Sequence, residues 1–328
     1  MAGLRTLLTR FAQMLLVLWT VATILFLLFR LMPGDPTVAY IDTTFTEDQI
    51  AQLRKSFGLD RPLPEQYLIY LKNLLVGEFG DSFHHRRPVI EVLASVLPNT
   101  IVLTLTGLVI AYVFGVLVGA WLAWRRGSWF EGVTIPTVLT LRAAPEFWLG
   151  MILLAVFSFN LGWFPSGGAN SPGAIYPSEW ARIFSQDFLW HLVLPAATLA
   201  LYLQGLPLLL MRSNMLDVMS EDFITMARMK GLSQWTIVIR HAARNALLPV
   251  ATAFALGFGA SVGGNVVVET VFSWPGLGKL LVGAVASSDY PVAQGAFFII
   301  TLVLVSMNFI ADLLYTVLDP RVSHGKRS

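Results

Sequence analysis

Two short motifs suggest catalysis or nucleotide binding, but the residues around each argue against it. GASVG at 259–263 matches the G-x-S-x-G pattern, in which a serine nucleophile sits at a sharp strand-to-helix turn. Here it lies within an apolar run, and its two outer glycines are spaced for close packing of a neighbouring helix. PGLGKLL around Lys279 resembles a phosphate-binding loop, but Ser273 and Leu280 replace the required glycine and Ser or Thr. We therefore predict neither a serine nucleophile nor an ATP-binding motif.

The histidines and the missing cysteines argue against a metal site. Of five histidines, two are adjacent in HHRR at 84–87, where neighbouring side chains point apart and no carboxylates join them. With no cysteine, the chain has neither a disulfide framework nor a thiolate site. We expect no metal ligands, no cofactor bound by this chain and no catalytic residues, and we predict that it is not an enzyme.

Ionisable residues within long apolar runs are a stronger functional signal, because a charge inside a membrane is costly. Arg142 and Glu146 are four residues apart in one run, as are Asn308 and Asp312 in another. Each pair could neutralise itself across one helical turn, or it could face a polar path. We favour a structural role for Asn308 and Asp312. For Arg142 and Glu146, which flank Pro145, both interpretations stay open.

The composition is that of a membrane protein. Of 328 residues, 55% are hydrophobic and 13% are charged, against about a quarter charged in soluble proteins. A net charge of +2 and the lack of a basic stripe argue against nucleic-acid binding. Gly115 and Gly119 repeat the packing spacing within one apolar run. Six runs are about long enough to span a bilayer: 11–29, 97–124, 133–160, 190–212, 246–270 and 293–318. The predicted fold is an all-α polytopic membrane protein with six transmembrane helices.

The positions of Lys and Arg orient these spans. Most basic residues fall on one side, with both termini, and the two short loops opposite hold only Arg182 and Lys279. The positive-inside rule places the basic side in the cytoplasm. The predicted division is a first span at 1–32, an extracytoplasmic loop region at 33–96, a five-helix core at 97–320 with a cytoplasmic loop at 212–245, and a cytoplasmic tail at 321–328.

Two short amphipathic helices are expected in the extracytoplasmic region, lying on the membrane or packed on the bundle. The first falls within 45–60 and the second within 63–80. In the second, one stripe is formed by Leu68, Leu71, Leu74 and Leu75.

EDFITMARMKG at 221–231 is a compact charged segment between two apolar runs. Ser220 is the expected N-cap, acidic residues follow it, basic residues come late, and Gly231 ends the helix. A second helical stretch, at 233–249, leads back to the membrane. Spacing alone permits a connector lying on the inner leaflet or a helix that transmits force from a docked partner.

Residues 221–249 resemble the coupling loop of ABC transporter permeases of the dipeptide/oligopeptide/nickel type. The resemblance covers almost the whole chain, because further family stretches follow in the expected order. They are RLMPGDP at 30–36, FGLDRPLPEQYLIYL at 57–71, GEFGDSF at 77–83, LPNT at 97–100, LGWFPSGG at 161–168, HLVLPAATLA at 191–200, VVVETVFSWPGLGKL at 266–280, DYPVAQG at 289–295 and NFIADLLYTVLDPR at 308–321.

Two departures affect which roles carry over. Aligned on Gly231, the Glu-Ala-Ala of the generic permease signature is Thr225, Met226 and Ala227, so its glutamate role does not pass to Glu221. The family's Ser-x-Pro-x-Phe in the third span reads AAPEF at 143–147, which makes Glu146 particular to this chain.

The resemblance implies a fold like that of type I ABC importer permeases and one membrane subunit of a prokaryotic importer in the inner membrane. Its implied partners are a second homologous permease, two cytoplasmic ATPase subunits that use ATP and Mg²⁺, an extracytoplasmic binding protein and the lipid membrane. The expected ATPase-coupling residues are Glu221, Asp222, Thr225, Ala227, Arg228, Lys230 and Gly231. The expected translocation path includes Arg142, Glu146, Gln204 and Asn265, and the structural polar residues are Asn308 and Asp312.

Peptides are the expected substrates, with nickel, oligosaccharides or another small solute as the alternative. A proton-coupled secondary transporter would use Arg142, Glu146, Glu269 or Asp312 as a relay. It should also show inverted repeats and paired broken helices, and none is evident in the sequence. An intramembrane serine protease would need a histidine facing Ser261, and no histidine lies deep in a span.

Overall fold

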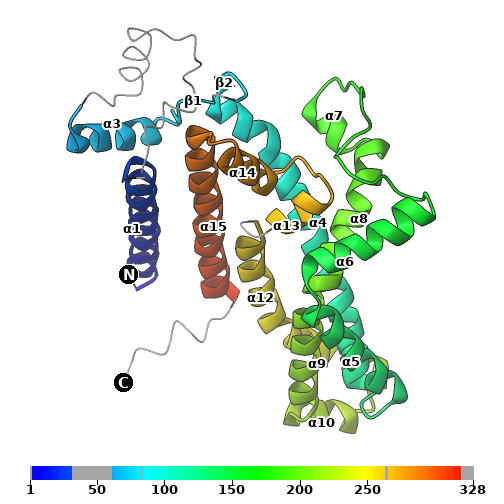
Figure 1. Ribbon diagram of the computed structural model, residues 1–328. Helices are drawn as coiled ribbons and strands as arrows, with labels where there is room; N and C mark the ends of the chain where they lie inside the picture. Colours follow the sequence, from blue (N-terminus) through cyan, green and yellow to red (C-terminus); the bar gives the residue numbers. More distant parts are fainter. Residues whose placement is uncertain (1, 32–60, 83, 263–264, 319–328) are drawn as a thin grey trace.

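The computed structural model describes residues 2–31, 61–82, 84–262 and 265–318. The described chain is almost entirely helical (Figure 1), with one short antiparallel pair of strands, β1 (Asp81–Ser82) and β2 (Arg87–Pro88). This confirms the predicted all-α class. The helices before the middle of the chain are α1 (Ala2–Leu31), α3 (Leu63–Leu75), α4 (Val89–Trp124), α5 (Trp129–Ala143), α6 (Glu146–Leu153) and the π-helical η2 (Leu154–Asn160).

The second half of the chain contains shorter helices at both ends of the bundle. They are α7 (Glu179–Ile183), α8 (Gln186–Leu203), α9 (Gly205–Met219), α10 (Asp222–Met229), α11 (Gln234–Thr236), the π-helical η3 (Ile237–Ala243), α12 (Arg244–Val262), α13 (Val266–Val271), α14 (Leu277–Ala286) and α15 (Tyr290–Leu318). In Figure 1, α10 lies at one end of the bundle and α7 at the other. We call these the α10 end and the α7 end.

Three described helices are long and apolar enough to cross a membrane, and five spans result if each bent pair of helices counts as one. The single spans lie in α1, α4 and α15, and the bent pairs are α5 with α6–η2 and α8 with α9. The remaining predicted span, 246–270, falls on α12 and α13 and passes through residues 263 and 264, which lie outside the described residues. Residue 263, the last of the GASVG stretch, is one of these two residues.

Close packing against α4 holds the centre of the bundle together. A Cβ added at Gly119 would lie 2.5 Å from the Leu208 carbonyl oxygen, and one at Gly115 would lie 2.9 Å from the Leu208 backbone nitrogen. Only glycine permits α9 to come this near, so the predicted packing role of the two glycines is confirmed. α4 also begins at Val89, well before residue 97, because its first turns are buried against α14 and α15 through Leu93, Leu281 and other apolar side chains.

The bend between α5 and α6 has a local cause. α5 ends at Ala143 and α6 begins at Glu146 after Pro145, with a bend of 104° between them. Proline disfavours helical geometry at the residue before it, and Ala144 is extended. α8 and α9 meet at Gln204 with a bend of 43°. The assumption that Arg142 and Glu146 lie one turn apart on one helix is therefore wrong.

α3 crosses the end of α1 near the α7 end (Figure 1), and the Tyr67 hydroxyl is 2.6 Å from Thr23 Oγ1. Leu71 and Leu74 pack against α1 and α15, which confirms the second amphipathic helix. The predicted stripe is only partly right, because Leu68 and Leu75 are exposed. α3 is rotated so that Tyr70 takes their place in the contact. The first predicted helix, within 45–60, lies outside the described residues.

Candidate functional site

The charged segment at 221–231 forms α10 at the tip of the bundle. Its C-terminal turn is closed by two backbone hydrogen bonds, from Gly231 N to Arg228 O at 3.0 Å and from Leu232 N to Ala227 O at 3.3 Å. Gly231 has a φ of +76°, which is the left-handed conformation expected of a helix-ending glycine. The prediction that Gly231 ends this helix is confirmed.

The predicted N-cap is wrong. α9 runs on to Met219, so Ser220 caps the C-terminus of α9 and its hydroxyl donates to Asp217 O at 2.7 Å. Glu221 is the residue before α10, and its side chain makes no capping bond. The chain therefore turns from α9 into α10 within two residues, which leaves α10 little freedom to move independently of α9.

α10 divides into a buried face and an exposed face. Ile224 and Ala227 are buried against Ile237 and Val238 of η3 and against Met215 of α9. Every other residue of 221–231 is exposed. Of the expected coupling residues, Ala227 is therefore directed into the bundle, and the remaining six are accessible to a partner.

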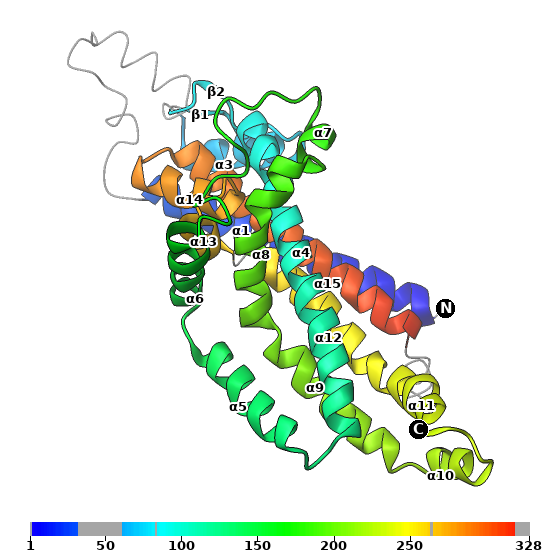
Figure 2. The ribbon, with the colours of Figure 1, turned by 90° about the vertical axis from the view of Figure 1, so that its right-hand side faces the viewer.

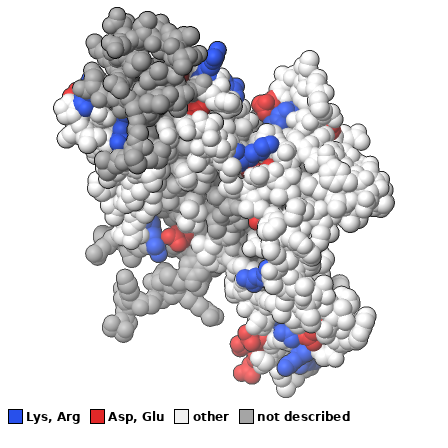
Figure 3. Space-filling model, viewed as in Figure 1, with Lys and Arg blue, Asp and Glu red and all other residues white. Residues whose placement is uncertain are grey.

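Sequence reasoning missed the apolar part of this exposed face. Met229 is 81% exposed and Met226 is 56% exposed, and Phe223 and Trp235 also reach the surface. Flexible methionines beside charged residues suit a protein-binding surface. Figure 3 shows acidic and basic side chains gathered at this end of the molecule. The signal was present in the sequence, because Met226 and Met229 are out of phase with Ile224 and Ala227 on a helix.

A partly buried ion pair fixes the α10 end of the bundle. Glu131, at the start of α5, accepts a hydrogen bond from Arg212 Nε of α9 at 2.7 Å and one from the Gly127 backbone nitrogen at 2.6 Å. Trp124 and Trp235 pack with ring centroids 5.8 Å apart. These contacts join the turn between α4 and α5 to α9 and to the segment after α10.

The expected path residues fall into two places. Arg142 is exposed at the end of α5, and its Cδ would lie 3.1 Å from a Cβ added at Gly205. Gln204, next to Gly205, is 5% exposed. The structure therefore places Arg142 against Gly205, the residue after Gln204, and Glu146 is half-buried at the start of α6. Asn265 lies elsewhere, where its amide donates a hydrogen bond to Thr104 Oγ1 of α4.

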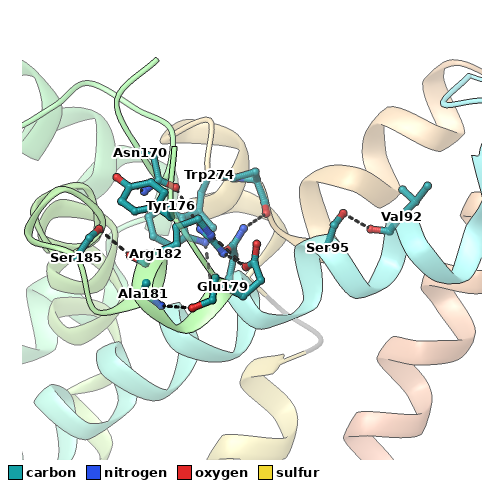
Figure 4. Close-up of polar contacts among 12 residues, drawn as sticks. Val92, Ser95, Asn170, Tyr176, Glu179, Ala181, Arg182, Ser185 and Trp274 are labelled. Atoms are coloured by element: carbon teal, nitrogen blue, oxygen red, sulfur yellow. Dashed lines mark hydrogen bonds and ion pairs between the residues drawn. The ribbon is translucent and has the colours of Figure 1, made fainter. Parts of the chain in front are cut away.

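A polar network at the α7 end was not anticipated from the sequence. Arg182 of α7 donates to Asn99 Oδ1 of α4 at 2.7 Å, to Asn170 Oδ1 at 3.2 Å and to Glu179 Oε2 at 2.8 Å (Figure 4). The Asn99 amide in turn donates to Pro275 O at 2.8 Å. One arginine thus joins the segment before α8 to α4 and to the segment before α14.

Glu269 extends this network into the bundle. Its carboxylate accepts from Thr100 Oγ1 at 2.6 Å and from Lys279 N at 2.9 Å, and Thr100 Oγ1 accepts from Leu277 N at 2.7 Å. The glutamate is fully buried. These donors satisfy the carboxylate. A structural role therefore explains why Glu269 lies inside the protein, and no role as a proton relay is needed to explain it. Among the described residues no group of three or more His, Cys, Asp and Glu is placed to hold a metal ion.

Asp312 makes an interhelical contact. Its carboxylate lies 3.4 Å from Arg10 Nε of α1, and Phe11 and Phe309 pack nearby with ring centroids 6.1 Å apart. Asn308 is exposed. The Asp312–Arg10 contact joins the first and last described helices.

Comparison with known proteins shows which families and relatives this chain resembles. Residues 115–324 match the family described as "Binding-protein-dependent transport system inner membrane component", and residues 3–104 match the corresponding N-terminal family. A protein from Brucella abortus (strain 2308), named as a peptide transport system permease, is 38% identical over 317 residues, which cover 97% of this chain and 98% of that protein. The glutathione transport system permease protein GsiC of Salmonella choleraesuis (strain SC-B67) is 37% identical over the same coverage.

A solved structure has a similar fold. It is described as inward-facing conformations of the MetNI methionine ABC transporter, and it superposes with a TM-score of 0.50 and 16% sequence identity. The likeness covers 70% of this chain and 97% of that one. The predicted fold, that of a helical type I ABC importer permease, is confirmed.

Proposed function

The chain belongs to the family of binding-protein-dependent transport system inner membrane components, and on that premise we propose that it forms half of the translocation path of an ATP-driven peptide importer. The resemblance to permeases of the peptide type is confirmed. In the proposed complex a second, homologous permease supplies the other half of the path. Two ATPase subunits bind ATP and Mg²⁺, and an extracytoplasmic binding protein delivers the substrate.

The observation that carries this proposal is the construction of α10. Its exposed face offers Met226, Met229 and charged side chains to a partner, while Ile224 and Ala227 hold it on η3 and α9. The buried face and the closed C-terminal turn fix α10 on the bundle, so a partner that binds its exposed face can move the helices beneath it. We propose that the ATPase subunits bind the exposed face of α10. When these subunits close, α9 and α5 move together because the Arg212–Glu131 pair joins them.

The orientation follows from the basic residues. Arg125, Arg126, Arg228, Lys230 and Arg240 all lie toward the α10 end, and α1 begins and α15 ends on that side in Figure 1. We propose that the α10 end is cytoplasmic, that both termini are cytoplasmic, and that the α7 end faces the binding protein across the inner membrane.

The proposed substrate class rests on the relatives. One is named as a peptide transport permease and another as a glutathione transport permease, and glutathione is itself a small peptide. Both names support a substrate that carries peptide bonds and free carboxylates. We therefore propose small peptides over nickel ions or oligosaccharides.

The test is uptake of trialanine, together with ATP hydrolysis, by the complete complex in proteoliposomes. Met226→Asp places a charge within the proposed ATPase contact, and we expect it to reduce peptide-stimulated hydrolysis by about tenfold or more. Val76→Asp, at an exposed apolar residue next to α3 at the other end, is the matched control and should retain stimulation. Full stimulation with Met226→Asp would refute coupling through α10, and no peptide uptake by the unaltered complex would refute the substrate class.

A further inference from the structure

The two interrupted spans meet halfway along their length. The break at 144–145 lies midway between the start of α5 and the end of η2, and Gln204 lies midway between the start of α8 and the end of α9. Figure 2 shows the two breaks at a similar height in the bundle. They are also in contact, because the stem of Arg142 packs over Gly205 and any side chain there would meet Arg142 Cδ at 3.1 Å.

Arg142 presents a positive charge at this depth without a partner among the described residues. Its side chain is exposed, and it makes no ion pair or hydrogen bond to the part of the chain that the structure describes. The 104° bend at Pro145 turns α6 away, so Glu146 does not neutralise it. An arginine without a partner at the middle of an apolar helix pair is too costly to face lipid, which favours a surface that faces water or a polar group.

Gln204 at the second break offers an amide that is complementary to a peptide. Gln204 is 5% exposed, and its amide makes no hydrogen bond to any described residue. Gln66 and Tyr70 hold the buried, unpaired side-chain polar atoms of the described residues, so the Gln204 amide reaches the surface and can hydrogen-bond to a bound molecule. Glu146 is half-buried at the first residue of α6. Arg142 thus lies against Gly205, the residue that follows Gln204 at the second break.

We propose that Arg142 binds a carboxylate of the transported substrate at mid-membrane, with Gln204 donating to or accepting from the same peptide. The guanidinium matches a carboxylate with two parallel hydrogen bonds, whereas an ammonium group would offer only a point charge. The site thereby selects substrates that carry a free carboxylate and holds them between delivery and release. This inference rests on the proposed function as a peptide importer.

The experiment compares trialanine with its C-terminal amide in proteoliposomes containing the complete complex and loaded binding protein. Each variant is normalised to the unaltered complex with the same peptide, so the selectivity of the binding protein cancels. Arg142→Gln should lower trialanine uptake by about tenfold and leave uptake of the amide within about twofold. Uptake of trialanine by Arg142→Lys should fall between these two values, because lysine keeps the positive charge but cannot form the two parallel hydrogen bonds of a guanidinium. Arg61→Gln, at an exposed arginine paired with Glu65, is the matched control.

The outcomes separate this inference from the function on which it rests. Uptake of both peptides by the unaltered complex, with an equal loss of both in Arg142→Gln, would overturn carboxylate recognition and leave the importer intact. Loss of the second permease from purified Arg142→Gln complex would also overturn it, because Arg142 would then be a subunit contact. No uptake of either peptide by the unaltered complex would overturn the peptide class, and the inference with it.

Discussion

Gly119 is a position at which the packing of α4 on α9 leaves no room for a single added methyl group. In Gly119→Ala, the new Cβ would lie 2.5 Å from the Leu208 carbonyl oxygen and 3.1 Å from Met211 Cβ. Real Cβ atoms do not approach a backbone oxygen so closely, so α4 and α9 must separate. Both Leu208 and Met211 are completely buried, and they have little room to adjust. Overpacking of this kind costs about 1–3 kcal/mol.

The matched control for this substitution is Gly132→Ala in α5. A Cβ added at Gly132 would meet nothing within 4 Å, and alanine there should stabilise the helix by about 0.5–1 kcal/mol. The measurement is the thermal unfolding midpoint of the purified complex in detergent, followed by circular dichroism. We expect Gly119→Ala to unfold at a lower temperature than the unaltered complex and Gly132→Ala at the same or a higher one. Equal midpoints for the two variants would show that α4 and α9 do not pack as described.

Two further predictions concern the polar network at the α7 end and the orientation of the chain. Thr100→Val removes the donor to Glu269 and the acceptor for Leu277 N, both in a buried place, and should lower the free energy of unfolding by about 1–3 kcal/mol. The same change at exposed Thr137, which bonds only to its own helix, should have little effect, and equal losses would contradict the network. A cysteine introduced at Ile175 should react with a membrane-impermeant maleimide in intact cells, and one introduced at Gln234 should react only after lysis. The native chain contains no cysteine, so reversed labelling would overturn the orientation.

The sequence predicted those parts of the fold that depend on local patterns. Long apolar runs predicted the helices of the bundle, and the charge pattern and Gly231 predicted α10 and its end. The glycines at 115 and 119 predicted a close helix contact, because their spacing leaves one face of α4 without side chains. In each case the signal lies within a single helix and the residues that flank it.

Features that depend on distant parts of the chain could not be predicted in this way. Arg182 and Asn99 are 83 residues apart, and nothing local indicates that they meet. Glu131 and Arg212 are likewise far apart in the sequence, and no local pattern indicates that they pair. The bend at Pro145 has an angle of 104°, which depends on the packing of α6 against α8 and α13. That angle decides whether Arg142 and Glu146 form a pair. The sequence could therefore name candidate residues of the path but could not predict how they lie relative to one another.

Coupling through α10 is the central claim, and cross-linking tests it most directly. A photoactivatable cross-linker on a cysteine introduced at Met229, which is 81% exposed on α10, should join the chain to an ATPase subunit in the assembled complex. The same reagent on a cysteine at Leu75, which is 86% exposed near the α7 end, should not reach that subunit. The account predicts an ATPase adduct from position 229 alone. Absence of that adduct, or an equal yield from position 75, would contradict it.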